Sequence, residues 1–120
     1  MPKLRLICSM EKISFPDFWK VELCVGTILD AQPFPQARKA AYQLRIDFGP
    51  ELGIKQSSAQ ITDLYEIPEL MGRQVIAVTN FPPKQIANYF SEVLVLGIEQ
   101  AGAVVLLQPE RPVENGSRIS

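Results

Sequence analysis

The stretch AYQLRIDF, residues 41–48, alternates its side chains between two faces. Tyr42, Leu44, Ile46 and Phe48 fall on one face, and mainly polar residues fall on the other. This period of two is typical of a β-strand with one buried face. Further strand-like runs occur at residues 23–31, 52–59, 73–80, 92–97 and 103–108. Short strands at fairly even spacing, separated by proline and glycine turns, predict an all-β fold, a small barrel or a sandwich.

Helical signals lie mainly at the N-terminal side of these strands. Ser14 can cap a helix, Pro16 suits a first turn, and Asp17 stands three residues after the cap. The pattern predicts a short N-terminal helix that ends at about residue 22. Small helical turns are also expected at residues 62–71, with an interruption at Pro68. We predict five main strands in total. Because there are six strand-like runs, two of them can be halves of one bent strand.

The short N-terminal helix carries an unusual number of aromatic residues. Phe15, Phe18 and Trp19 line one side of it at spacings of three and four. These rings can plug the end of their own barrel or pack on another subunit, and both alternatives stay open. Because two-fold dimers are the commonest closed oligomers, we predict a homodimer with these three residues in its interface. Residues 104–107 are the second expected contact.

Composition bounds the class of protein. A chain of 120 residues is one domain of common size, here divided into an extension at residues 1–14 and a domain at residues 15–120. Lysine and arginine total 12 against 13 acidic residues, so any basic patch for nucleic acid must be local. No apolar stretch is long enough to span a membrane, and the start is too interrupted for a signal peptide. The expectation is a cytoplasmic protein without membrane insertion.

Catalytic machinery is absent from the sequence. There is no histidine, no glycine-rich phosphate loop and no metal-ligand spacing, and Cys8 and Cys24 are expected to be reduced thiols in apolar surroundings. Ser57 and Ser58 lack a histidine partner, which leaves a serine–lysine arrangement or a carboxylate site as the catalytic alternatives. We therefore predict no enzyme, no cofactor and no metal.

Cations do gather at three loop or strand-end positions. Arg38 and Lys39 follow FPQA, Lys55 lies in GIKQSS, and Lys84 lies in FPPKQ, each beside small polar residues. If a barrel brings these positions to one face, the cations can bind phosphates while hydroxyls and amides read bases or peptide backbone. The alternative is a scatter of solvated charges.

The stretch TNFPPKQIANYFS, residues 79–91, joins two strand-like runs. We expect a bent connection stiffened by its prolines, in which Ile86 and either Tyr89 or Phe90 face inward. The other ring, with Phe34, Pro35 and Pro83, is expected to line an apolar surface groove.

Long segments resemble one known family. They are VGTILDAQPFPQAR (25–38), LRIDFG (44–49), GIKQSSAQIT (53–62), GRQVIAVTNFPPKQIANYFSEVLVLG (72–97) and VVLLQPERPVENGSRI (104–119). The chain is similar to the tRNA-binding domain family, and within it to stand-alone chaperones associated with protein secretion. The resemblance implies a five-stranded barrel of the oligonucleotide-binding fold, a homodimer, tRNA binding, and binding of unfolded or precursor polypeptides.

The same resemblance, with the cation pattern, gives a set of expected binding residues. They are Phe34, Pro35, Arg38, Lys39, Lys55, Ser57, Ser58, Gln60, Asn80, Pro83, Lys84, Tyr89 and Ser91. Phe34 stands where the family has histidine, and Ala87-Asn88 stands where the family has arginine and glycine. Because lost cations weaken phosphate binding, these departures favour the polypeptide role. The alternative is a protein that primarily binds tRNA or other RNA.

Overall fold

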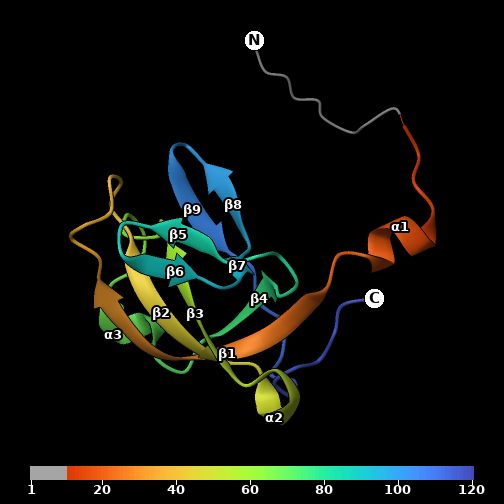
Figure 1. Ribbon diagram of the computed structural model, residues 1–120. Coiled ribbons are helices and arrows are strands. Elements are labelled where there is room, and N and C mark those ends of the chain that lie inside the picture. The colour runs from red at the N-terminus through yellow and green to blue at the C-terminus, as the bar shows by residue number, and fades with distance from the viewer. Residues whose placement is uncertain (1–10) are drawn as a thin grey trace.

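The computed structural model describes residues 11–120, and twelve short elements follow one another along this part of the chain (Figure 1). They are α1 Phe15–Trp19, β1 Leu23–Pro33, β2 Tyr42–Asp47, α2 Gly49–Leu52, β3 Ile54–Ala59, α3 Ile67–Leu70, β4 Gln74–Val78, β5 Lys84–Ile86, β6 Tyr89–Ser91, β7 Leu94–Val95, β8 Gly97–Gln100 and β9 Ala103–Leu106. The all-β prediction is confirmed.

Five antiparallel strands form the central sheet in the order β3-β2-β1-β4-β7, and this sheet curls into a nearly closed barrel. Side chains help to close it between its edges. The Gln56 N–H on β3 donates to the Glu92 carboxylate at 2.9 Å, and the Ser58 N–H donates to Ser91 Oγ at 3.0 Å. In return, the Glu92 N–H donates to the Gln56 carbonyl at 2.8 Å. The β3 edge is therefore covered rather than left open.

The alternating stretch at residues 41–48 behaves as predicted. Leu44, Ile46 and Phe48 are almost fully buried in the barrel core, whereas Arg45 between them is exposed. Gly26 on β1 makes room for this packing, because a Cβ there would lie 2.6 Å from Ile46 and 2.7 Å from Phe48. Any side chain at this position would displace the core.

Several local expectations differ from the structure. The N-terminal helix has the predicted capping box at Ser14, but it ends at Trp19 rather than near residue 22. Pro68 lies in the first turn of helix α3 instead of interrupting it, since a proline there lacks only an N–H that has no helical partner. Residues 84–91 form the hairpin β5–β6 rather than an irregular bent connection.

The C-terminal tail extends the sheet along β1. The Gly116 N–H donates to the Val25 carbonyl at 2.8 Å, and the Val25 N–H donates to the Ser117 carbonyl at 2.9 Å. A third bond joins the Ile119 N–H to the Leu23 carbonyl at 2.8 Å. These contacts hold a segment of loop-like composition against the barrel and bring its residues near the start of the domain.

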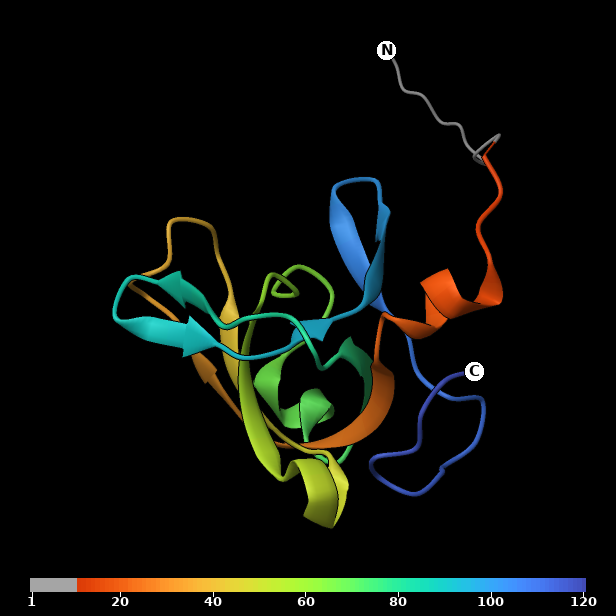
Figure 2. The ribbon, with the colours of Figure 1, turned by 45° about the vertical axis from the view of Figure 1, so that its right-hand side comes forward.

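Helix α1 stands to one side of the barrel and buries none of its residues (Figure 2). The exposed fractions of Phe15 and Trp19 are 61% and 38%. Arg118 from the tail lies over the Trp19 ring, 3.4 Å from its centre, and the Asn80 amide bonds to the backbone of Lys20 and Glu22. The alternative in which these aromatic rings plug their own barrel is therefore wrong.

The two cysteines have different outcomes. Cys24 is 3% exposed within the core, as expected. Cys8 lies outside the described residues, as does most of the extension expected at residues 1–14.

Candidate functional site

A hollow of about 680 Å³ lies between the loop that follows β1 and the hairpin β5–β6. Both views place these two segments side by side (Figures 1 and 2). The residues that line the hollow are Gln36, Ala37, Arg38, Lys39, Ala41, Ser58, Gln60, Lys84, Gln85, Ile86 and Ala87. We call this hollow the β5 pocket. Its volume falls within the range of roughly 300–1,000 Å³ that is typical of ligand sites.

The charge of the β5 pocket is one-sided. Arg38, Lys39 and Lys84 are exposed on its walls, and no lining residue is an aspartate or glutamate. In the described part of the chain the ion pairs are Lys20–Asp17 and Arg111–Glu110, so none of the three pocket cations is neutralised by a neighbour. Clustered, unpaired cations in a concave site attract anionic groups.

Neutral polar groups accompany these cations. Ser58 and Gln60, from the end of β3 and the residue after it, line one side, and Gln36 and Gln85 line the opposing loop and β5. Hydroxyl and amide groups can both donate and accept hydrogen bonds. The pocket can therefore bind a charged group and, beside it, a polar backbone.

An aromatic pair ties the two walls of the pocket together. The Phe34 ring, only 3% exposed, packs against Tyr89 with 5.2 Å between ring centres and an interplanar angle of 58°. The prediction that Phe34 lines a surface groove is therefore wrong in placement: its ring belongs to the support of the pocket. Tyr89 faces inward as one of the two alternatives, and Phe90 is half exposed.

Tyr89 carries a buried hydroxyl that lacks a hydrogen-bond partner. Burial, and secondarily the negative charge of Glu92, raise the pKa of Tyr89 to about 12. The Ser57 backbone opposes this shift without reaching hydrogen-bonding geometry. The phenol is therefore neutral at physiological pH and serves as packing rather than as an acid or base.

The structure gathers only part of the expected residue set. Arg38, Lys39, Ser58, Gln60 and Lys84 line the β5 pocket together. The other expected residues, Phe34, Pro35, Lys55, Ser57, Asn80, Pro83, Tyr89 and Ser91, are not among its lining residues.

Three of those outlying residues have structural duties instead. Ser57 is fully buried and donates to the Val93 carbonyl at 3.1 Å, so it is not available to a ligand. Asn80 anchors the segment after α1, and Ser91 accepts from β3. Lys55 stands near the opposite end of β3 from Ser58.

Sequence reasoning missed the small lining residues Ala37, Ala41 and Ala87, together with Ile86. Ala87 has a φ of 55°, a left-handed conformation that is uncommon for alanine, in the two-residue turn between β5 and β6. Since only the first of the two turn residues has a positive φ, the usual signal for such a turn is glycine at the first position. The pair Ala87-Asn88 does not give that signal, so the sequence does not predict the hairpin.

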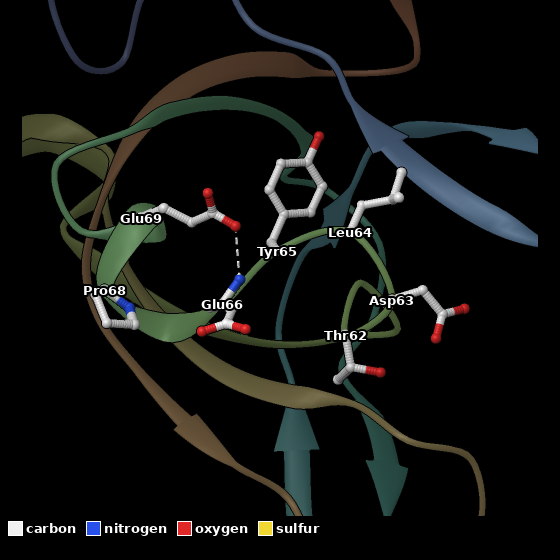
Figure 3. Close-up of a pocket in the computed structure, with 7 residues that line it drawn as sticks. All are labelled: Thr62, Asp63, Leu64, Tyr65, Glu66, Pro68 and Glu69. Atoms are coloured by element: carbon white, nitrogen blue, oxygen red, sulfur yellow. Dashed lines mark hydrogen bonds between the residues drawn. The ribbon is translucent and has the colours of Figure 1, made fainter.

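A second hollow, of about 510 Å³, lies around the start of α3 (Figure 3). One of its carboxylates is already engaged, since the Glu66 N–H donates to Glu69 Oε1 at 2.7 Å. No cluster that could hold a metal ion occurs among residues 11–120. In the same residues, every helix is too short to cross a bilayer.

Comparison with solved structures gives close matches. The chaperone CsaA from Bacillus anthracis str. Ames is 52% identical with a TM-score of 0.85, and the match covers 92% of this chain and 100% of that one. The CsaA chaperone protein from Picrophilus torridus is 49% identical with a TM-score of 0.86, over 91% of this chain and 100% of that one.

Curated relatives include the methionine–tRNA ligase of Thermococcus onnurineus, which is 34% identical over 111 residues. The match covers 92% of this chain but only 15% of that enzyme, so the chain corresponds to a small part of it. The profile of the putative tRNA binding domain matches residues 23–118, which include the whole barrel. The chain therefore belongs to the tRNA-binding domain family.

Proposed function

We propose that this protein is a non-catalytic, homodimeric chaperone that binds unfolded or precursor polypeptides in support of protein export. The observation that carries the proposal is the β5 pocket with exposed apolar side chains on the segment that builds it. Phe81 and Phe90, before and within the hairpin, are 51% and 50% exposed. A surface with cations, amides and apolar rings can bind an unfolded polypeptide, because the charged, polar and apolar side chains of such a polypeptide are all exposed. The similarity to two chaperones named CsaA supports the same role.

The homodimer is supported by the aromatic side of α1. Phe15 and Trp19 stack with 5.6 Å between their rings, yet their outer surface faces solvent. An exposed aromatic cluster of this kind marks an interaction surface. A second copy of the chain is the occupant that the family resemblance implies.

Binding of tRNA is the second candidate function, and the cations of the β5 pocket favour it. Arg38, Lys39 and Lys84 can each neutralise a phosphate. No aromatic residue lines the pocket, so bases have no ring there on which to stack. The pocket therefore contacts the sugar–phosphate backbone of tRNA rather than its bases.

Salt dependence separates the two roles. Labelled tRNA and a labelled, permanently unfolded polypeptide are titrated with the protein at 50 and 200 mM salt, roughly the range over which phosphate contacts weaken. With three phosphate contacts, tRNA affinity is expected to fall by roughly 20- to 50-fold, while polypeptide affinity changes far less. Absence of any binding to the unfolded polypeptide would overturn the chaperone role.

A further inference from the structure

We propose that strand β5 accepts a client polypeptide as an added β-strand, and that the cations of the β5 pocket select acidic segments of that client. The inference rests on the proposed polypeptide binding and specifies how the client is held. In this mode the backbone of the client forms hydrogen bonds with the backbone of β5, and exposed apolar side chains alone do not provide such bonds.

The free edge of β5 follows from the register of its hairpin. Ile86 pairs with Tyr89 across a two-residue turn, and Lys84 pairs with Ser91. Hydrogen-bonded and non-hydrogen-bonded pairs alternate in an antiparallel ladder, and the pair next to a two-residue turn is hydrogen-bonded. The pair between them, Gln85 with Phe90, is therefore non-hydrogen-bonded. The backbone N–H and C=O of Gln85 therefore point away from β6.

These backbone groups remain unpaired in the structure. Within residues 11–120, no turn or loop backbone group bonds to the N–H or C=O of Gln85. All residues from Lys84 to Ala87 line the β5 pocket, so this edge of the hairpin is one wall of the hollow. A strand added at the usual spacing of about 4.8 Å would lie inside the pocket.

The charges around this edge determine which client fits. Arg38 and Lys39 stand on the loop opposite β5, and Lys84 stands on β5 itself, with no lining carboxylate to oppose them. Aspartate and glutamate side chains of an extended client would meet these cations. Lysine-rich segments would be repelled.

A polypeptide satisfies this edge better than RNA does. The Gln85 carbonyl needs a hydrogen-bond donor and its N–H needs an acceptor, and every second residue of an extended peptide supplies both. A phosphate offers only acceptors. RNA is therefore expected to contact the cations of the pocket without completing the strand pairing.

The hairpin that carries the edge is held in place before a client arrives. The Phe34–Tyr89 ring pair joins it to the opposite wall, and Ser91 joins it to β3 through the Ser58 N–H. A rigid edge loses little entropy when a partner adds to it.

The test removes one N–H. Gln85→Pro deletes the outward N–H, and proline is tolerated where an edge N–H faces solvent. The matched control is Glu99→Pro, which places proline at the equivalent non-hydrogen-bonded position of the two-residue hairpin β8–β9, outside the pocket. Thermal unfolding and circular dichroism establish that both variants fold.

The probes are fluorescein-labelled decapeptides of alternating sequence, (Val-Asp)₅, (Val-Asn)₅ and (Val-Lys)₅, with binding followed by anisotropy. We expect (Val-Asp)₅ to bind at least tenfold more tightly than the other two. Gln85→Pro is expected to weaken it at least tenfold, whereas Glu99→Pro leaves it within about twofold. A (Val-Asp)₅ peptide N-methylated on every second residue should also bind the unaltered protein at least tenfold more weakly.

Two results would overturn strand addition. One is an N-methylated peptide that binds the unaltered protein as tightly as its parent. The other is a folded Gln85→Pro protein with unchanged peptide affinity. If an unfolded polypeptide still binds in either case, the chaperone role stands and only this mode of binding fails. Tight binding of tRNA together with no binding of any polypeptide would instead refute the proposed function itself.

Discussion

At the scale of single residues, adjacent serines have different roles. Ser57 is fully buried and donates to the Val93 carbonyl at 3.1 Å, while Ser58 lines the β5 pocket. Replacing Ser57 by alanine leaves a buried carbonyl with a poorer partner, which costs about 1–2 kcal/mol of unfolding free energy. Urea unfolding of Ser57→Ala should show this loss, with ligand affinity unchanged. A Ser57→Ala protein of unchanged stability but weakened binding would contradict this assignment.

Tyr89 gives a residue-scale prediction about pH. Burial raises its folded-state pKa to about 12 from an ordinary value of 10.0, so the folded protein holds the phenolic proton more tightly than the unfolded chain does. Stability is therefore expected to fall as pH rises from about 10 to about 12. Tyr89→Phe keeps the ring on Phe34, removes the unpartnered hydroxyl, and should remove this component of the pH dependence.

The comparison for Tyr89 is made by denaturant unfolding of both proteins across this alkaline range. At neutral pH the phenylalanine variant should be as stable as the parent or more so, because a buried hydroxyl without a partner is lost. A variant that loses more than about 1 kcal/mol at neutral pH would show that the hydroxyl makes a net favourable interaction.

At the scale of elements, local sequence patterns predict individual strands but do not predict contacts between residues that are far apart in the sequence. The alternation in residues 41–48 predicted β2 because both the pattern and the strand are local. No local signal predicts the hairpin β5–β6, because its turn contains Ala87, which the fold holds at a positive φ. The burial of Phe34 depends on Tyr89, far along the chain, and no local pattern records that contact.

Only some of the expected binding residues lie in one pocket, for the same reason. Cations in loops could be picked out from the sequence, and Arg38, Lys39 and Lys84 do share one pocket. Lys55 has the same local character but lies toward the other end of its strand. Which loop residues lie close together depends on how the strands pair, and this pairing cannot be predicted from local sequence patterns.

The closure of the barrel beside β6 is an element-scale feature that can be tested directly. The Glu92 carboxylate accepts the Gln56 N–H at 2.9 Å, and charge-assisted bonds of this kind are stronger than neutral ones. Glu92→Ala should lower the protection of the Gln56 amide in hydrogen exchange by roughly tenfold or more. The control is Glu99→Ala, on an exposed strand that takes no part in this closure. Equal protection in both variants would mean that the side-chain bond contributes little to closing the barrel.

At the scale of the whole molecule, α1 and the hairpin β5–β6, which forms one wall of the β5 pocket, lie on opposite sides of the barrel in both views (Figures 1 and 2). Pairing through α1 would therefore leave both pockets of a dimer open. Replacing Phe15 and Trp19 by serine removes the exposed aromatic cluster and should convert the proposed dimer to monomers of 13.4 kDa. Light scattering at micromolar concentration measures this change.

A control for the dimer test uses an apolar residue of similar exposure elsewhere. Leu64 is 50% exposed near α3, and Leu64→Ser should leave the dimer intact. A monomeric parent protein, or a dimer that survives loss of both aromatic residues, would place the interface elsewhere or remove it.

The central claim is that the chain binds its ligands in the β5 pocket, and one anisotropy measurement tests it most directly. The pocket variant carries Arg38→Gln, Lys39→Gln and Lys84→Gln, and the charge-matched control carries Lys12→Gln, Lys20→Gln and Arg111→Gln, all exposed and outside the pocket. At a fixed salt concentration, the pocket variant is expected to bind labelled tRNA and an acidic unfolded polypeptide at least tenfold more weakly than the control does, and its salt slope for tRNA should be flatter by about 2–3. Equal affinity of the two variants for both ligands would contradict the claim.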